Sequence, residues 1–276
     1  MTTTTLPQTP GVPAPDRPSV GRSKLTWAVS DALTIAQRNL IALFRVPTTL
    51  VFSTIQPVIF VLMFRYVFGG SIQIPGIPYV DYLMPGIFVQ SVTFGAMNTG
   101  VGLAEDLRQG LIERFRSLPM ARSAVLAGRT LADVARNGIV VTLMVIVGFM
   151  VGFRIHTNPL AFLASIGLLL LFGFAMSWVM ALVGLRAGNA EAAQAMAFPI
   201  MALLVFASSA FVQTSTMPGW LQAYADHQPV TATVNAARAL CIGGPTAGKV
   251  LAAVLWSVGI VAVFAPLAVR RYRKTA

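Results

Sequence analysis

The chain of 276 residues is 56% hydrophobic and only 11% charged, whereas a soluble domain usually has about a quarter of its residues charged. This composition excludes an ordinary water-soluble globule and indicates that the chain is dissolved in lipid. The formal net charge of +11 would suit a nucleic-acid binder, but the basic residues gather between long apolar stretches, which indicates membrane topology and no nucleic-acid partner.

The first 23 residues are rich in Thr and Pro. They lack the apolar segment of a cleaved signal peptide. We expect residues 1–23 to form a disordered cytoplasmic tail, followed by a single transmembrane domain over residues 24–276.

An amphipathic segment precedes the first long apolar stretch. Its polar side includes Arg38 and Arg45, while its apolar residues recur at helical spacing. The apolar set is Leu33, Ala36, Leu40, Leu43 and Phe44. The pattern predicts an interfacial helix that ends at Pro47. This helix is either a membrane anchor or an elbow that also contacts a cytoplasmic partner.

Six stretches are long and apolar enough to span a membrane as helices, each of which needs roughly 20 residues. They lie near residues 48–68, 83–104, 137–154, 160–184, 193–213 and 249–269. Pro57 and Pro199 should bend the first and fifth of these helices. Gly148 and Gly152 form a GxxxG pair in the third, a pattern typical of close helix contact. The predicted fold class is an all-α integral membrane protein with six transmembrane helices.

The charges fix the orientation of these helices. Most of the 20 basic residues fall in the tail, between spans two and three, or after span six. Only Arg65, Arg154, Arg238 and Lys249 fall at or beyond the opposite ends of the helices. By the positive-inside rule, both termini are predicted to be cytoplasmic in the bacterial plasma membrane.

The connection between spans two and three, about Glu105 to Arg136, contains two amphipathic pieces. Charged residues surround the apolar stripe of the first piece, which Pro119 closes. That stripe is Leu107, Leu111, Phe115 and Leu118. The second piece leads into span three. The first piece is either an amphipathic loop lying on the membrane or a docking helix for a soluble partner.

Residues 213–248 alternate turn signals with two short helical stretches. Trp220 and Tyr224 lie four residues apart and suit the membrane interface. We expect short re-entrant helices that dip into the outer leaflet between spans five and six.

Gly243, Gly248 and Lys249 reproduce the GxxxxGK spacing of a phosphate-binding loop. Val250 replaces the Ser or Thr that would hold magnesium, no predicted strand precedes the motif, and the topology places it outside the cell. We therefore expect no ATP site on this chain.

Ionisable residues are absent from the centres of the predicted spans, and the nine acids fall in loops or at helix ends. Ion-coupled carriers usually place such a residue near the bilayer centre, so power is expected to come from another chain. Cys241, His156 and His227 are interpreted as structural residues, and we predict neither catalytic residues nor a metal site.

The stretch from Glu105 to Asn137 resembles the ABC-2 type exporter permeases, particularly the daunorubicin-resistance branch found in actinobacteria. The resemblance rests on Glu105-Asp106, Glu113-Arg114, Leu118-Pro119 and Gly128-Arg129. A second match lies in the outer segment, at Pro218-Gly219-Trp220, His227-Gln228-Pro229-Val230 and Ala237-Arg238.

The resemblance implies a permease subunit that pairs with a second permease, identical or different, above two copies of an ABC ATPase subunit, which binds ATP and magnesium. Arg38, Phe44 and Arg45 would belong to the elbow helix. The residues implied in ATPase coupling are Glu105, Asp106, Arg108, Glu113, Arg114, Phe115, Arg116, Leu118 and Pro119.

The resemblance further implies a cargo cavity between the two permeases, which alternates between inward and outward access. Polar or adaptable residues of spans two and five are the candidates for the cargo path: Gln90, Phe94, Met97, Asn98, Phe206, Ser208 and Ser209. The absence of charge in the spans favours an apolar or amphipathic drug or lipid. The alternatives are an autonomous secondary carrier and a membrane scaffold that transports nothing.

Overall fold

The computed structural model describes residues 47–70, 74, 76–110 and 122–275. All regular structure within these residues is helical. The elements are α2 (Pro47–Leu62), the π-helical η1 (Met63–Phe68), α3 (Tyr79–Gly95), α4 (Met97–Arg108), α6 (Arg122–Met150), α7 (Pro159–Gly184), α8 (Ala190–Phe206), η2 (Thr214–Thr216), α9 (Gly219–Asp226), α10 (Pro229–Ile242) and α11 (Ala247–Thr275). The predicted elbow helix lies outside the described residues, as does residue 111 onward of the docking helix predicted around Arg108 to Met120.

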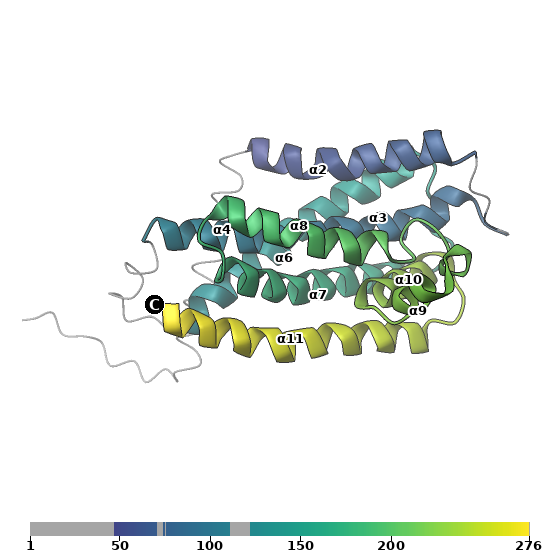
Figure 1. Ribbon diagram of the computed structural model, residues 1–276. Coiled ribbons are helices and arrows are strands. Elements are labelled where there is room, and N and C mark those ends of the chain that lie inside the picture. The colour runs from purple at the N-terminus through teal and green to yellow at the C-terminus, as the bar shows by residue number, and fades with distance from the viewer. Residues whose placement is uncertain (1–46, 71–73, 75, 111–121, 276) are drawn as a thin grey trace, which may run out of the picture.

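The long helices run side by side, as Figure 1 shows. Helix α7 packs against α3, α4, α6, α10 and α11, and α3 is buried from Tyr79 through Thr93. Helices α9 and α10 lie at one end of the bundle, whereas the end of α4 and the C-terminus lie at the other (Figure 1). The bundle thus has two ends formed by different elements.

Four helical segments are long and apolar enough to cross a membrane: Tyr79–Arg108, Gly128–Met150, Pro159–Gly184 and Ala247–Tyr272. They correspond to predicted spans two, three, four and six, so the chain is a multi-pass membrane protein. Predicted spans one and five correspond to the shorter apolar helices Thr54–Phe68 and Ala190–Phe206. The number of six spans stays a prediction.

Predicted span five runs to residue 213, but α8 ends at Phe206. Ser208 stabilises the turn that follows: its hydroxyl donates to the Val205 carbonyl at 2.6 Å and accepts from the Ala210 N–H at 3.1 Å. Short polar side chains compete with helical hydrogen bonds in this way. The apolar stretch therefore continues past the end of the helix.

Helices α4 and α7 approach each other at glycines. A Cβ atom added to Gly184 would lie 2.2 Å from the Gly100 carbonyl oxygen, and one added to Gly100 would lie 2.6 Å from the Met180 carbonyl oxygen. Backbone atoms cannot move aside as a flexible side chain can. The sequence places these two glycines 84 residues apart, so no local GxxxG pattern predicts that they meet.

Gly184→Ala is expected to lower the free energy of unfolding by about 1 to 3 kcal/mol, because the added methyl group overpacks a backbone contact. Gly167→Ala, on the same helix, is the matched control, since a Cβ at Gly167 meets no atom within 4 Å. Denaturant unfolding in detergent, followed by tryptophan fluorescence, measures both variants. Equal stability of the two would contradict the close α4–α7 contact.

Candidate functional site

A small pocket lies between α2, α3, α4 and α6, with a volume of about 70 Å³. Its polar lining side chains are Gln56, Gln90, Ser91, Asn98, Arg136 and Asn137. Polar side chains within membrane helices usually face the bundle interior or a cavity, where they contact ligands or each other. This pocket is therefore the candidate site.

The structure brings three of the predicted cargo-path residues to the pocket: Gln90, Phe94 and Asn98. Their spacing of four residues puts them on one side of the α3–α4 segment. Met97 packs against the neighbouring apolar core. It is not among the residues that line the pocket.

The other three predicted residues lie after or at the end of α8. The Ser209 hydroxyl donates to Asn235 Oδ1 at 3.1 Å, and its N–H donates to the Thr231 hydroxyl at 3.2 Å. Phe206 stacks on Phe211, with ring centroids 5.6 Å apart. Ser208 and Ser209 thus shape a turn and do not line the pocket.

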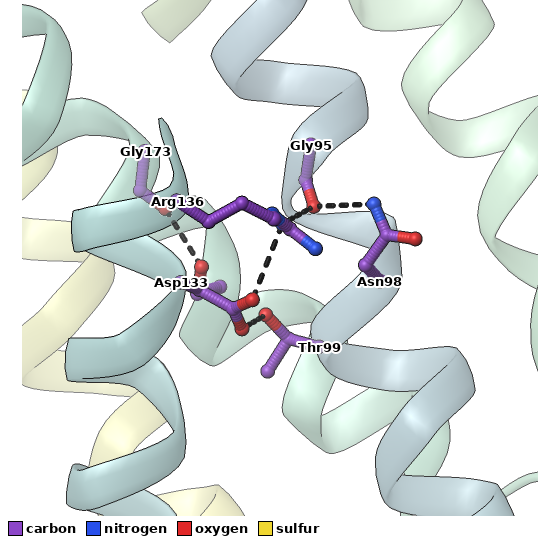
Figure 2. Close-up of polar contacts among 7 residues, drawn as sticks. Gly95, Asn98, Thr99, Asp133, Arg136 and Gly173 are labelled. Atoms are coloured by element: carbon purple, nitrogen blue, oxygen red, sulfur yellow. Dashed lines mark hydrogen bonds and ion pairs between the residues drawn. The ribbon is translucent and has the colours of Figure 1, made fainter. Parts of the chain in front are cut away.

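The helix that carries the pocket is interrupted at Ala96, between α3 and α4. The Thr99 N–H donates to the Ala96 carbonyl at 3.1 Å. The Gly95 carbonyl accepts from two side chains, Asn98 Nδ2 at 3.2 Å and Arg136 Nη2 (Figure 2). Side chains from α4 and α6 therefore satisfy the backbone at this α3–α4 junction.

A buried ion pair on α6 holds both sides of the junction. Arg136 lies 3.2 Å from Asp133, and the two residues are 7% and 8% exposed. Figure 2 shows Asp133 accepting the Thr99 hydroxyl of α4 while Arg136 reaches Gly95 of α3. Each charge has both an opposite charge and a hydrogen bond, which is the condition under which buried ions are tolerated.

The sequence prediction that the acids lie in loops or at helix ends was wrong for Asp133. This residue is buried within α6, inside the apolar segment Gly128–Met150. The available signal was the spacing of Asp133 and Arg136, because residues three apart share a helix face.

The ends of α4 and α6 carry the described part of the predicted coupling region. Arg108 donates to both carboxylate oxygens of Glu105, with the nearest contact at 2.7 Å. Arg129 of α6 pairs with Asp106 of α4. The second pair ties the two helices together on either side of residues 111–121. Glu113, Arg114, Phe115, Arg116, Leu118 and Pro119 lie outside the described residues.

The opposite end of the bundle has its own polar contacts. Asp81, at the start of α3, accepts from the Arg154 N–H and contacts His156 Nε2, each at 2.9 Å. Arg238 lies 3.6 Å above the centre of the Tyr82 ring and donates to the Ser209 carbonyl at 2.9 Å. These contacts give Arg154, Arg238 and His156 partners within the chain.

Two features of the sequence resemble chemical sites: the Gly243–Lys249 motif and Cys241. Helix α10, and no strand, precedes the Gly243–Lys249 motif. Burial raises the pKa of the Cys241 thiol to about 11, and its sulfur lies 3.6 Å from the Ser165 hydroxyl. A thiol with this pKa stays protonated near neutral pH and is a poor nucleophile. Among the described residues there is no cluster of metal-ligating side chains.

Comparison with known proteins identifies relatives over most of the chain. The profile of the ABC-2 type transporter family matches residues 31–242. The chain is 37% identical over 246 residues to the daunorubicin resistance ABC transporter permease protein DrrB1 of Streptomyces coeruleorubidus, covering 89% of this chain and 87% of that protein. It is 26% identical over 271 residues to the probable doxorubicin resistance permease DrrC of Mycobacterium tuberculosis, covering 95% of each.

Proposed function

Because the chain belongs to the family of ABC-2 type transporters, we propose that it is the membrane-spanning permease of an ATP-driven exporter whose ATPase is a separate polypeptide. The observation that carries this proposal is the family match over residues 31–242, which includes every described helix from α2 to α10 and leaves out only α11. Relatives across the same region are named as permease proteins of drug-resistance ABC transporters.

The proposed topology has six spans in the bacterial plasma membrane with both termini in the cytoplasm. Four long apolar helices support it, and α2 with η1 and α8 would supply the remaining two spans. The end of α4 and the C-terminus lie at the same end of the bundle (Figure 1). The basic residues of the sequence assign that end to the cytoplasm.

The proposed partners are two copies of an ABC ATPase and a second permease. The segment between α4 and α6 would dock into the ATPase, with the elbow helix beside it. The Asp106–Arg129 pair supports this role, because it joins the two helices that a moving docking segment would push. ATP and magnesium would bind to the ATPase, and its closure would switch the permease pair from inward to outward access.

The proposed cargo is an apolar or amphipathic drug or lipid. Exposed apolar side chains such as Ile146, Leu203 and Leu255 face outward from the described helices, where they can contact lipid or an apolar cargo. The pocket would receive the polar part of an amphipathic cargo. A cargo of this kind would enter from the membrane and leave outward.

Reconstitution into liposomes tests this function. The chain together with its co-purified ATPase is expected to move an amphipathic fluorescent cargo only when ATP and magnesium are supplied. Movement driven by a proton gradient, in liposomes that lack any ATPase, would contradict the proposal and support an autonomous carrier. ATPase binding without cargo movement would support a scaffold.

A further inference from the structure

We propose that the pocket between α2, α3, α4 and α6 binds an uncharged group that both donates and accepts hydrogen bonds, such as a carboxamide or a hydroxyl, and rejects a carboxylate. This inference rests on the proposed function and names the substrate chemistry of the same site. It follows from the size of the pocket, the side chains that line it and the balance of charge around Arg136.

The size of the pocket limits what it can hold. Sites for whole drug-like molecules usually enclose about 300 to 1,000 Å³, whereas this pocket has about 70 Å³. A single water needs about 10 to 15 Å³ measured in the same way. The pocket therefore accommodates a substituent of a few non-hydrogen atoms, and the apolar remainder of the cargo stays outside it.

The lining is rich in groups that both donate and accept. Gln56, Gln90, Asn98 and Asn137 contribute carboxamides, which have both functions. Among the described residues, Gln90 Oε1 and Asn137 Nδ2 are buried without a hydrogen-bond partner. Buried polar atoms are normally paired, and the last side-chain torsion of an amide turns readily. A ligand with a donor and an acceptor can satisfy such a lining.

The charge of the site is balanced internally. Among the described residues that line the pocket, Arg136 is the charged one. The Asp133 carboxylate lies 3.2 Å away and balances its positive charge. An anionic ligand would have to draw Arg136 away from Asp133 and leave that carboxylate buried without its partner. The described residues that line the pocket include no carboxylate for a cationic ligand. An uncharged ligand leaves the arrangement in Figure 2 intact.

The test compares alkyl probes of one chain length that end in a carboxamide, a carboxylate or a trimethylammonium group. Binding is measured to the full chain with its co-purified ATPase in lipid nanodiscs, without ATP, and binding to empty nanodiscs is subtracted. The carboxamide is expected to bind at least about tenfold more tightly than either charged probe. Equal or tighter binding of the carboxylate or the ammonium overturns the inference.

Variants connect this preference to the pocket. Gln90→Leu is expected to weaken carboxamide binding about tenfold, since it replaces a hydrogen-bonding side chain with an apolar one of similar size. Asn98→Leu, at an exposed position of the lining, provides a second variant if the first does not fold. Thr142→Val on the exposed face of α6 is the control and should bind the probe normally. Unchanged binding in folded Gln90→Leu or Asn98→Leu overturns the assignment to this pocket.

Changes to the ion pair test the role of charge. Asp133→Asn removes the charge that balances Arg136, so the carboxylate probe should gain at least about tenfold relative to the carboxamide. The charge-neutral double variant Asp133→Asn/Arg136→Gln should keep the carboxamide preference. The charge-balance argument is contradicted if the carboxylate probe binds more tightly to neither variant. It is also contradicted if binding of that probe improves equally in both.

The outcome is separable from that of the proposed function. A preference for the carboxamide probe without ATP-driven movement of cargo would contradict the exporter proposal but support the pocket chemistry. ATP-driven movement of cargo with no preference among the three probes would contradict the pocket chemistry but support the exporter proposal.

Discussion

Arg136→Met is expected to lower the free energy of unfolding by about 3 to 5 kcal/mol, because it leaves the buried Asp133 carboxylate without its counter-charge. It also removes one of the two side-chain donors to the Gly95 carbonyl at the α3–α4 junction, and leaves Asn98 as the other. The double variant Arg136→Met/Asp133→Asn should recover a substantial part of the loss, since no uncompensated charge remains. Denaturant unfolding in detergent measures the complete cycle.

Arg108→Met is the matched control. Arg108 and Glu105 also form an ion pair three residues apart, at 2.7 Å, but the Arg108 side chain is 60% exposed. Exposed pairs contribute little to stability because water screens them. If Arg136→Met and Arg108→Met lower the free energy of unfolding by similar amounts, burial of the Asp133–Arg136 pair does not determine its contribution to stability.

The double variant Arg114→Glu/Arg116→Glu is expected to reduce ATPase attachment at least about tenfold, because reversed charges would repel acidic residues of the docking surface. The reason comes from the sequence: both arginines flank the apolar stripe of the predicted docking helix, which Pro119 ends. Quantitative pull-down of the ATPase from detergent-solubilised membranes measures the effect. Loss of attachment should also abolish ATP-driven export.

Arg17→Glu/Arg22→Glu makes the same change of net charge in the predicted tail and is expected to leave attachment unchanged. Membrane insertion of both double variants is checked by fractionation. Full ATPase attachment in the inserted Arg114→Glu/Arg116→Glu variant would contradict a coupling role for the stretch around Arg108 to Met120.

The boundaries of the apolar spans could be predicted where composition and helix signals coincide. The stretch predicted at 160–184 became α7, Pro159–Gly184, whose start is marked by Asn158 accepting from the Ala161 N–H at 2.7 Å. Helix α11 extends beyond the predicted end at 269 to Thr275. Apolar composition marks only the part in lipid, whereas a helix can continue into water.

The interruption at Ala96 was not predicted, and part of what stabilises it is a contact between helices. Asn98 is a local donor to the Gly95 carbonyl, but the second donor, Arg136 of α6, is 41 residues away in the sequence. The GxxxG pair illustrates the same limit. A Cβ atom added to Gly148 would lie 2.8 Å from the Met84 side chain of α3, so this glycine does permit a close contact. Gly152 adopts a φ of 99° just past the end of α6 and meets nothing within 4 Å, whereas Gly100 and Gly184 form a close backbone contact outside the predicted pair.

Three of the seven predicted cargo-path residues line the pocket, and their spacing in the sequence explains why. Gln90, Phe94 and Asn98 repeat every four residues along one helical segment, so they share a side. The prediction for Ser208 and Ser209 assumed that span five continued as a helix to residue 213. Because α8 ends at Phe206, these serines bond to the turn and to α10 instead.

The most direct test of the central claim is purification of the tagged full chain from its native membrane in mild detergent, followed by mass spectrometry of the proteins that co-purify in stoichiometric amount. The exporter account predicts a P-loop ATPase in that fraction, and the same spectrum identifies a second permease if the pair is heteromeric. Repeated absence of any ATPase from a preparation that still moves cargo would contradict the account.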